Sequence, residues 1–285
     1  MKKQLRARTF NFEQTPQSSH TVLPAPPAEF IPTCKLDVIT SCSAEGWTRY
    51  GQKCVRSFMD YWPAGIKLHL VSEDNLTQHI SGYDPNRIVF HSLYSYELAA
   101  KFYERHKDNK ASKGYKRHTF YNFREDAYRF SKKVFAIRLV TLNMIEGRVI
   151  WLDADTVTSS AIPLELLYRM PPDDYCLAFL DRPRYHSECG FVGYNLNHQD
   201  TKDFIAKFAQ LYELDKVFDL REWHDSWVFD WLRHKMQIRG YPISHNNLSH
   251  PFVHSELGKY MDHMKGNRKN LGMSVEHPKY KRKKG

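Results

Sequence analysis

Alternating apolar and polar positions in the first part of the chain predict β-strands with a helix between them. Residues 66–71 alternate regularly, and residues 35–40 form a run rich in β-branched side chains. Apolar residues recur at helical spacing over 50–61, and a third short strand is predicted at 87–90. A strand, helix, strand order favours parallel βαβ units.

The second half of the chain continues this rhythm. An apolar stripe over 125–146 predicts a helix that terminates at Gly147, and the apolar run at 148–152 predicts a buried strand. Further predicted elements are a short helix at 162–167, a strand at 175–180, a strand with two glycines at 188–195, a helix at 201–214 and a helix starting at Trp223. The order predicts an α/β fold with a mostly parallel central sheet flanked by helices.

Three regions lack a sustained period. Residues 1–33 are basic and then rich in Pro, Ser and Thr, which predicts a flexible N-terminal arm, and 271–285 form a basic C-terminal tail. Residues 93–124 mix aromatic and basic side chains. That mixture could stack single-stranded nucleic acid, cover a pocket as an ordered insertion, or form a lid. A single folded domain is therefore expected over 34–270, with an insertion at about 93–124.

Two aspartates, Asp153 and Asp155, follow the apolar run at 148–152. If the strand continues through them, side chains two residues apart point the same way, into the crevice at the carboxyl end of the sheet. Two carboxylates without a neighbouring Cys suit Mg²⁺ or Mn²⁺. The alternative is that Asp155 only turns the chain or caps a helix.

Other candidate residues lie on either side of this pair. Lys133, on the preceding predicted helix, could reach a phosphate in the same crevice or could be solvated. Asp225 is either a first-turn acid of its helix or a pocket acid. His263 and Lys269 flank Gly266 in a segment that could supply a metal ligand and neutralise a diphosphate, or could be a simple basic loop.

Composition narrows the partners. The 285 residues carry 42 Lys+Arg against 32 Asp+Glu, a formal charge of +10, which favours a nucleotide, a nucleic acid or a membrane surface as partner. Five scattered cysteines indicate neither a disulfide framework nor a zinc knuckle, and histidines 245, 250, 254 and 263 fit no compact zinc motif. No apolar signal or membrane-spanning run is present, so a cytoplasmic location is expected.

Three segments, taken in order, resemble glycosyltransferase family 8, which includes glycogenin and bacterial galactosyltransferases. Residues 131–136 followed by 149–156 resemble its lysine-headed helix and its "LDADT" strand. Residues 189–195 resemble its acceptor-side strand, which ends in an asparagine, here Asn195. His263-x-x-Gly266-x-x-Lys269 matches its C-terminal motif. The resemblance extends over most of residues 34 to 270.

This resemblance implies the GT-A fold, a Rossmann-like fold of nucleotide-diphospho-sugar transferases. It also implies sugar transfer from a nucleotide sugar, a UDP-sugar first, to a hydroxyl of a saccharide, lipid-linked or protein acceptor, with retained configuration. Asp153, Asp155 and His263 would hold Mn²⁺ or Mg²⁺, and Lys269 would contact the diphosphate. The remaining donor-binding residues would be Thr40, Ser41, Ser43, Lys133, Ala154 and Gly266.

The sequence departs from the family in two places. The tryptophan that commonly follows the final motif is missing after Lys269, and Asp225 is followed by Ser226 where the family frequently has Gln. If the enzyme inverted configuration, a carboxylate would have to deprotonate the acceptor, and Asp225 and then Glu188 are the candidates.

Two other functions remain open from the sequence. One is a nucleotidyltransferase, although residues 41–46 lack the arginine expected after its first strand. The other is a non-enzymatic nucleic-acid-binding protein, which would bind in a strongly salt-dependent manner without needing Asp153 or Asp155. Nucleic acid is the less expected partner.

Overall fold

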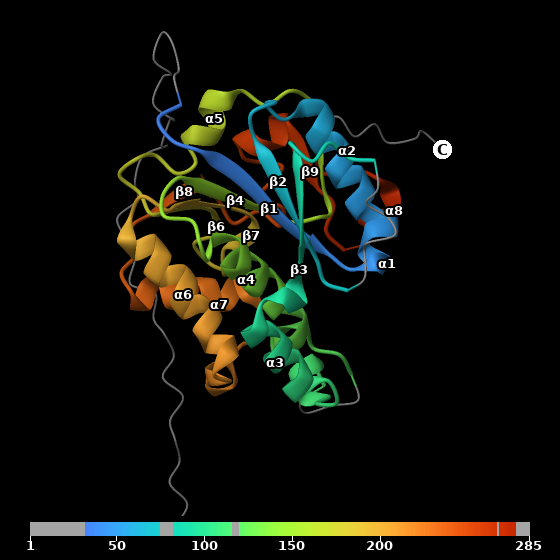
Figure 1. Ribbon diagram of the computed structural model, residues 1–285, viewed down its shortest axis with the longest axis vertical. Helices are drawn as coiled ribbons and strands as arrows, with labels where there is room; N and C mark the ends of the chain where they lie inside the picture. The colour runs from blue at the N-terminus through green and yellow to red at the C-terminus, as the bar shows by residue number, and fades with distance from the viewer. Residues whose placement is uncertain (1–31, 75–81, 116–119, 267, 278–285) are drawn as a thin grey trace, which may run out of the picture. The chain divides into compact units, whose positions relative to one another are not determined.

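The centre of the fold is a seven-stranded sheet in the order β3-β2-β1-β4-β7-β6-β8 (Figure 1). The computed structural model describes residues 32–74, 82–115, 120–266 and 268–277. Strand β7 runs antiparallel to both of its neighbours, β4 and β6, and the other neighbouring pairs are parallel. The fold is therefore α/β with a mostly parallel sheet, as predicted from the sequence.

The strands of this sheet are β1 Leu36–Cys42, β2 Lys67–Ser72, β3 Ile88–Ser92, β4 Arg148–Leu152, β6 Leu177–Asp181, β7 Glu188–Asn195 and β8 Gly240–His245. A separate two-stranded sheet pairs β5 Thr156–Thr158 with β9 Met261–His263. The α-helices are α1 Ala44–Gly46, α2 Gln52–Tyr61, α3 Glu97–His106, α4 Ala127–Thr141, α5 Leu164–Tyr168, α6 Gln199–Glu213, α7 Asp225–Lys235 and α8 Arg268–Leu271. Shorter helical turns are η1 Trp47–Gly51, η2 Leu93–Ser95, η3 Ala111–Lys113, η4 Phe123–Glu125, η5 Lys216–Asp219 and η6 Glu256–Lys259.

The central strands are buried on both faces, which explains their nearly continuous apolar runs. Every position of β1, β4 and β7 is buried, whereas the edge strand β3 has one buried position, Ile88, followed by partly buried and exposed ones. Parallel strands covered by helices on both faces require such runs, because neither face contacts water.

An aromatic core lies between the sheet and the helices α3, α4, α6 and α7, which gather on one side of the sheet in Figure 1. Helix α4 packs against β1 and against both α6 and α7. The largest apolar side chains of this core are fully buried and include Phe102, Phe135, Phe204, Tyr212 and Phe229. Because α4 precedes β4 in the chain, this packing helps to fix where β4 begins.

One prediction from the periodicity is wrong. The helix predicted to end at Gly147 ends at Thr141. Gly147 has a φ of +104° and lies at the entry to β4, where a Cβ would sit 2.9 Å from the carbonyl oxygen of Lys35. Gly147 therefore serves as a turn and close-packing position and not as a helix cap, since only glycine combines this φ with such an approach.

The segment 93–124, which shows no clean period in the sequence, contains the helix α3. Its buried face is formed by Ala99, Phe102, Tyr103 and His106. Basic side chains on the exposed face obscure this stripe in the sequence. Residues 116–119, almost all of the predicted arm and most of the predicted tail lie outside the described residues. No helix in the described part of the chain is long and apolar enough to cross a membrane.

Candidate active site

Asp153, Ala154 and Asp155 form a turn between β4 and β5. Strand β4 ends at Leu152, so the expectation that both aspartates continue the strand is wrong. The N–H of Thr156 donates to the carbonyl of Asp153 at 2.9 Å, and the N–H of Asp153 donates to the carbonyl of Gly190 in β7 at 2.9 Å. The turn is therefore held from within and from the neighbouring strand, and Ala154 is buried inside it.

The short sheet β5–β9 brings His263 to this turn. His263 pairs with Thr156 in the antiparallel register, and the N–H of Met264 donates to the carbonyl of Asp155 at 2.9 Å. The Nε2 of His263 lies 3.1 Å from Asp155 Oδ1 and 3.4 Å from Asp153 Oδ2. One ligand atom from each of these three residues lies within 4.8 Å of the other two. Two carboxylates and an imidazole are a donor set that fits Mn²⁺ or Mg²⁺.

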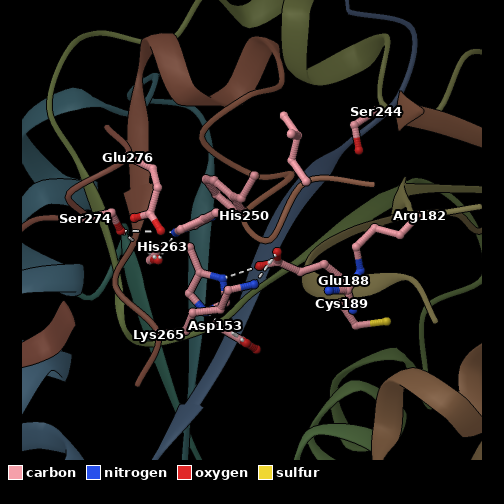
Figure 2. A network of polar contacts seen from close by, with 12 residues as sticks. Asp153, Arg182, Glu188, Cys189, Ser244, His250, His263, Lys265, Ser274 and Glu276 are labelled. Atoms are coloured by element: carbon pink, nitrogen blue, oxygen red, sulfur yellow. Dashed lines mark hydrogen bonds and ion pairs between the residues drawn. The ribbon is translucent and has the colours of Figure 1, made fainter. Parts of the chain in front are cut away.

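Glu188 orients the imidazole from its other side. Figure 2 shows the Glu188 carboxylate facing both His263 and Lys265. Its oxygens lie 2.6 Å from His263 Nδ1 and 2.6 Å from Lys265 Nζ. The ring can approach this closely only because position 190 is glycine: a Cβ there would lie 2.5 Å from two ring atoms of His263.

Lysines neutralise the two aspartates. Lys133, from α4, lies 2.9 Å from Asp153 Oδ1 and 2.6 Å from Asp225 Oδ2. Its Nζ also donates to the carbonyl of Cys189 at 2.8 Å. Lys269 lies 2.9 Å from Asp155 Oδ2. Lys133 thus joins the turn after β4, the glycine-containing strand β7 and the first turn of α7.

The site contains four acidic and four cationic side chains, and each lies beside a partner of opposite charge. The acids are Asp153, Asp155, Glu188 and Asp225, and the cations are Lys133, His263, Lys265 and Lys269. Buried ions are tolerated only when they are paired in this way.

These pairs shift the pKa values of the groups involved. Burial lowers the pKa of His263, but Asp155 and Glu188 outweigh it and raise that pKa to about 10. Burial raises the pKa of Asp155, but His263 and Lys269 outweigh it and hold the carboxyl below its usual range. Burial also raises the pKa of Asp225, but Lys133 and His224 outweigh it and lower that pKa. Each of these acids is therefore ionised at neutral pH.

Residues from the C-terminal part of the chain form hydrogen bonds that hold the backbone of β9 at His263. The Nε2 of His250 lies 2.9 Å from the carbonyl oxygen of His263 and 3.1 Å from the hydroxyl of Ser274 (Figure 2). The N–H of Ser274 donates to Asp262 Oδ2 at 2.6 Å. Strand β9 is therefore held both by β5 and by residues that follow it in the chain.

The predicted donor-binding residues near β1 make no side-chain hydrogen bond to this cluster among the described residues. Thr40 and Ser41 belong to the strand and not to a loop, because β1 extends to Cys42. Thr40 is fully buried, and its hydroxyl has no hydrogen-bond partner among the described residues. The Ser41 hydroxyl donates to Glu73 at 2.8 Å, and Ser43 caps α1.

Gly266 lies between the cluster residues Lys265 and Lys269. It is exposed and has a φ of +61°. The N–H of Lys269 donates to the Gly266 carbonyl at 3.3 Å, so the glycine turns the chain back and returns Lys269 to the aspartates.

The structure adds three residues that the sequence analysis did not single out. Lys265 pairs with Glu188, the indole of Trp151 donates to Asp153 Oδ1 at 2.6 Å, and the Lys269 ammonium lies 4.4 Å from the centre of the Tyr50 ring. Trp151 precedes Asp153 by two positions and Lys265 follows His263 by two, a spacing that could have suggested them. No comparable signal marks Tyr50.

No protein-family model matches the chain, and no curated protein matches it. Solved structures with a similar arrangement include the glycosyltransferase GlyE of Streptococcus pneumoniae TIGR4, at 14% identity and a TM-score of 0.45, over 74% of this chain and 45% of GlyE. The bifunctional glycosyltransferase WbbM matches at 12% identity and a TM-score of 0.42, over 76% of this chain and 40% of WbbM. Mouse xyloside xylosyltransferase 1 matches at 15% identity and a TM-score of 0.39, over 73% of this chain and 77% of that protein.

The chain thus spans less than half the length of GlyE and of WbbM.

Proposed function

We propose that this protein is a metal-dependent glycosyltransferase of the GT-A type that transfers a sugar from a nucleotide-diphospho-sugar, a UDP-sugar first, to an acceptor hydroxyl. The observation that carries the proposal is the convergence of Asp153, Asp155 and His263, with ligand atoms within 4.8 Å of one another and Lys269 beside them. Such a cluster suits a diphosphate held through a divalent cation and a lysine.

A Mn²⁺ or Mg²⁺ ion held by Asp153, Asp155 and His263 would act as a Lewis acid that stabilises negative charge on the leaving diphosphate. The remaining tasks fall to the chain's own residues. Lys269, 2.9 Å from Asp155, is positioned to exchange that partner for a phosphate oxygen. Glu188 holds the Nδ1 of His263, which orients the imidazole toward the aspartates.

The two carboxylates considered as general bases are both engaged by cations. Asp225 is paired with Lys133, and Glu188 is paired with His263 and Lys265. These partners lower the pKa of each carboxyl despite burial, which makes each a weak base. We therefore propose that configuration is retained, an outcome that requires no strong protein base, and that both acids act as positioning residues.

The proposal is tested by donor hydrolysis. The purified protein is offered UDP-, GDP-, ADP- and dTDP-sugars with and without Mn²⁺, and released nucleoside diphosphate is measured. We expect release from one donor, most readily a UDP-sugar, that needs metal and falls at least about 100-fold in Asp153→Asn and Asp155→Asn. Asp219→Asn, which changes an acid with a 74% exposed side chain, is the matched control and should keep full activity.

Other products would point to the alternative functions. A nucleotidyltransferase would release pyrophosphate from a nucleoside triphosphate. If no sugar nucleotide is hydrolysed, donor binding is measured by calorimetry with Mn²⁺ present. Absence of binding, combined with salt-dependent nucleic-acid binding that persists in Asp153→Asn, would overturn the proposal.

A further inference from the structure

A second cluster of metal-ligating side chains lies outside the site described above. His186 belongs to the loop between β6 and β7, and Glu222 and His224 precede α7. One ligand atom from each residue lies within 4.8 Å of the other two. The side chain of His224 is only 3% exposed and that of Glu222 13% exposed, so the cluster is largely removed from water.

We propose that His186, Glu222 and His224 form a zinc site. Two imidazoles and one carboxylate are a set that binds Zn²⁺ through three protein ligands and leaves a fourth position for water. Imidazole nitrogen favours zinc and its neighbours in the transition series, whereas carboxylate oxygen favours Mg²⁺ and Mn²⁺. The two clusters of this chain therefore differ in the metal they select.

The spacing of the ligands supports this assignment. His224 Nε2 lies 3.1 Å from Glu222 Oε2. Two ligands of one tetrahedral zinc ion, each about 2.0–2.1 Å from it, lie roughly 3.3 Å apart. The rings of His186 and His224 have centroids 4.6 Å apart and an interplanar angle of 67°, an edge-on approach. Among the described residues, no hydrogen bond to a ring nitrogen of His186 is found.

The loop that carries His186 is held in place by its own hydrogen bonds. Arg182 Nε donates to the carbonyl of His186 at 2.8 Å. The N–H and hydroxyl of Ser187 donate to the two carboxylate oxygens of Asp230 in α7 at 2.6 and 2.8 Å. The backbone around His186 is thus fixed relative to α7, which lowers the ordering cost of binding an ion.

The surroundings of His224 are apolar on one side. The rings of Phe123 and Phe130 lie with their centroids 5.4 and 5.8 Å from the His224 ring. A hydrophobic wall of this kind limits access of water to a bound metal and strengthens its interaction with charged ligands.

Two arginines share Glu222 but do not exclude a cation. Arg221 lies 3.0 Å from Oε1, the oxygen that faces away from His224, and Arg124 lies 3.7 Å from Oε2. Their side chains are 72% and 58% exposed, so water screens both charges and both chains can move aside.

An ion at this position would tie the loop before β7 to the start of α7. His186 precedes Glu188 by two residues, and His224 directly precedes Asp225. The zinc would therefore stiffen the segments that carry two residues of the candidate active site without touching the donor. This role is independent of the proposed sugar transfer.

The test is a direct measurement of zinc binding to the full chain after treatment with a chelator. Zn²⁺ is titrated against a chromophoric competitor, with the Asp155→Asn variant run in parallel to remove any contribution from the Asp153–Asp155–His263 cluster. In that variant we expect one equivalent bound with a Kd below about 1 µM. His186→Gln and His224→Gln, each made in the Asp155→Asn background, should weaken this binding at least about 100-fold. His254→Gln in the same background, an exposed histidine elsewhere, should leave it unchanged.

Co²⁺ provides a second measurement that does not depend on the His186→Gln and His224→Gln variants folding. Bound tetrahedrally by two imidazoles and a carboxylate, it should give an intense visible spectrum in the Asp155→Asn protein, and added Zn²⁺ should remove that spectrum. Either of two results overturns the proposal: no equivalent of zinc or cobalt bound by the Asp155→Asn protein, or zinc binding undiminished in folded His186→Gln and His224→Gln variants.

Discussion

At the scale of single residues, His263 is the group on which the candidate active site depends. Its Nε2 faces Asp153 and Asp155, and its Nδ1 faces Glu188. With carboxylates on both sides, the ring holds a proton that a metal ion has to replace, because ligation requires the neutral imidazole.

The raised pKa of His263 predicts pH-dependent metal binding. Since that pKa is about 10, the ring is protonated at neutral pH and one proton leaves as the ion binds. The apparent Mn²⁺ affinity should therefore rise about tenfold per pH unit between about pH 6 and 8. Calorimetry in buffers of different ionisation enthalpy should report release of about one proton per ion.

In the metal-free protein the raised pKa of His263 also makes the folding stability depend on pH. A folded pKa near 10 against an ordinary 6.5 contributes stability that is fully present below pH 6.5 and lost as the pH rises through about 10. His245→Gln, at an exposed histidine, is the control and should show the same pH dependence as the parent. A Mn²⁺ affinity that stays constant over the measured pH range in both proteins would contradict this assignment of the proton.

The residues of the cluster were predictable from the sequence to different degrees. Asp153 and Asp155 stand out by spacing after an apolar run, and His263 and Lys269 were candidates whose separate roles came from the resemblance to family 8. Their assembly was expected only through that resemblance, because it depends on a contact between chain segments far apart in sequence that no local pattern reports. His186 and His224 illustrate the same limit, since their spacing matches no zinc motif and only the fold brings them together.

At the scale of elements, strand β7 contacts the His263 ring of β9 at Gly190. A Cβ at this position would lie 2.5 Å from the His263 ring, well inside contact distance. The glycines in the 188–195 run were interpreted from the sequence as marks of close backbone approach, and Gly190 fits that interpretation.

Gly190→Ala is predicted to disable metal binding more than folding. The added methyl has to push the His263 ring away from the aspartates, so Mn²⁺ affinity should fall at least about tenfold. Overpacking of this kind costs about 1–3 kcal/mol of unfolding free energy. Calorimetric titration and urea denaturation measure the two effects.

Gly65→Ala is the matched control, because a Cβ at Gly65 has no atom within 4 Å. It should leave both metal affinity and stability nearly unchanged. Unaltered Mn²⁺ binding by Gly190→Ala would show that the ring of His263 tolerates displacement, contrary to the geometry described.

Elements with long apolar runs were predicted well, and short ones were missed. The predicted strands at 35–40, 66–71 and 148–152 correspond to β1, β2 and β4 within two residues at either end. Strands β5 and β9 have three residues each, too few for a period, and their pairing is decided by tertiary contact. The same limit explains why Asp153 and Asp155 were expected in a strand.

At the scale of the whole molecule, the aromatic core between the sheet and α3, α4, α6 and α7 sets the stability. Phe135 in α4 is fully buried, and its ring lies within 5.5 to 6.2 Å of the rings of Phe102, Tyr103, Tyr96 and Tyr212. This cluster joins three helices, so removing its central ring leaves a cavity that cannot easily collapse.

Phe135→Ala is predicted to lower the unfolding free energy by about 3–5 kcal/mol. Ile145→Ala, at an apolar side chain that is 81% exposed, should change it by no more than about 0.5 kcal/mol. Chemical denaturation followed by circular dichroism measures both. A loss below about 1 kcal/mol for Phe135→Ala would mean that the core does not depend on this ring.

The position of His263 in β9 has a consequence for how the protein matures. A ribosome delivers the chain from its N-terminus, and all seven strands of the large sheet are complete once His245 has emerged. His263, the strand that carries it and the Ser274 that supports it come later. A nascent chain halted between these points could form the large sheet before His263 is available to Asp153 and Asp155. Maturation would then have two stages. The seven-stranded sheet would fold first, and the ability to bind the cation would follow only when the last described residues had folded.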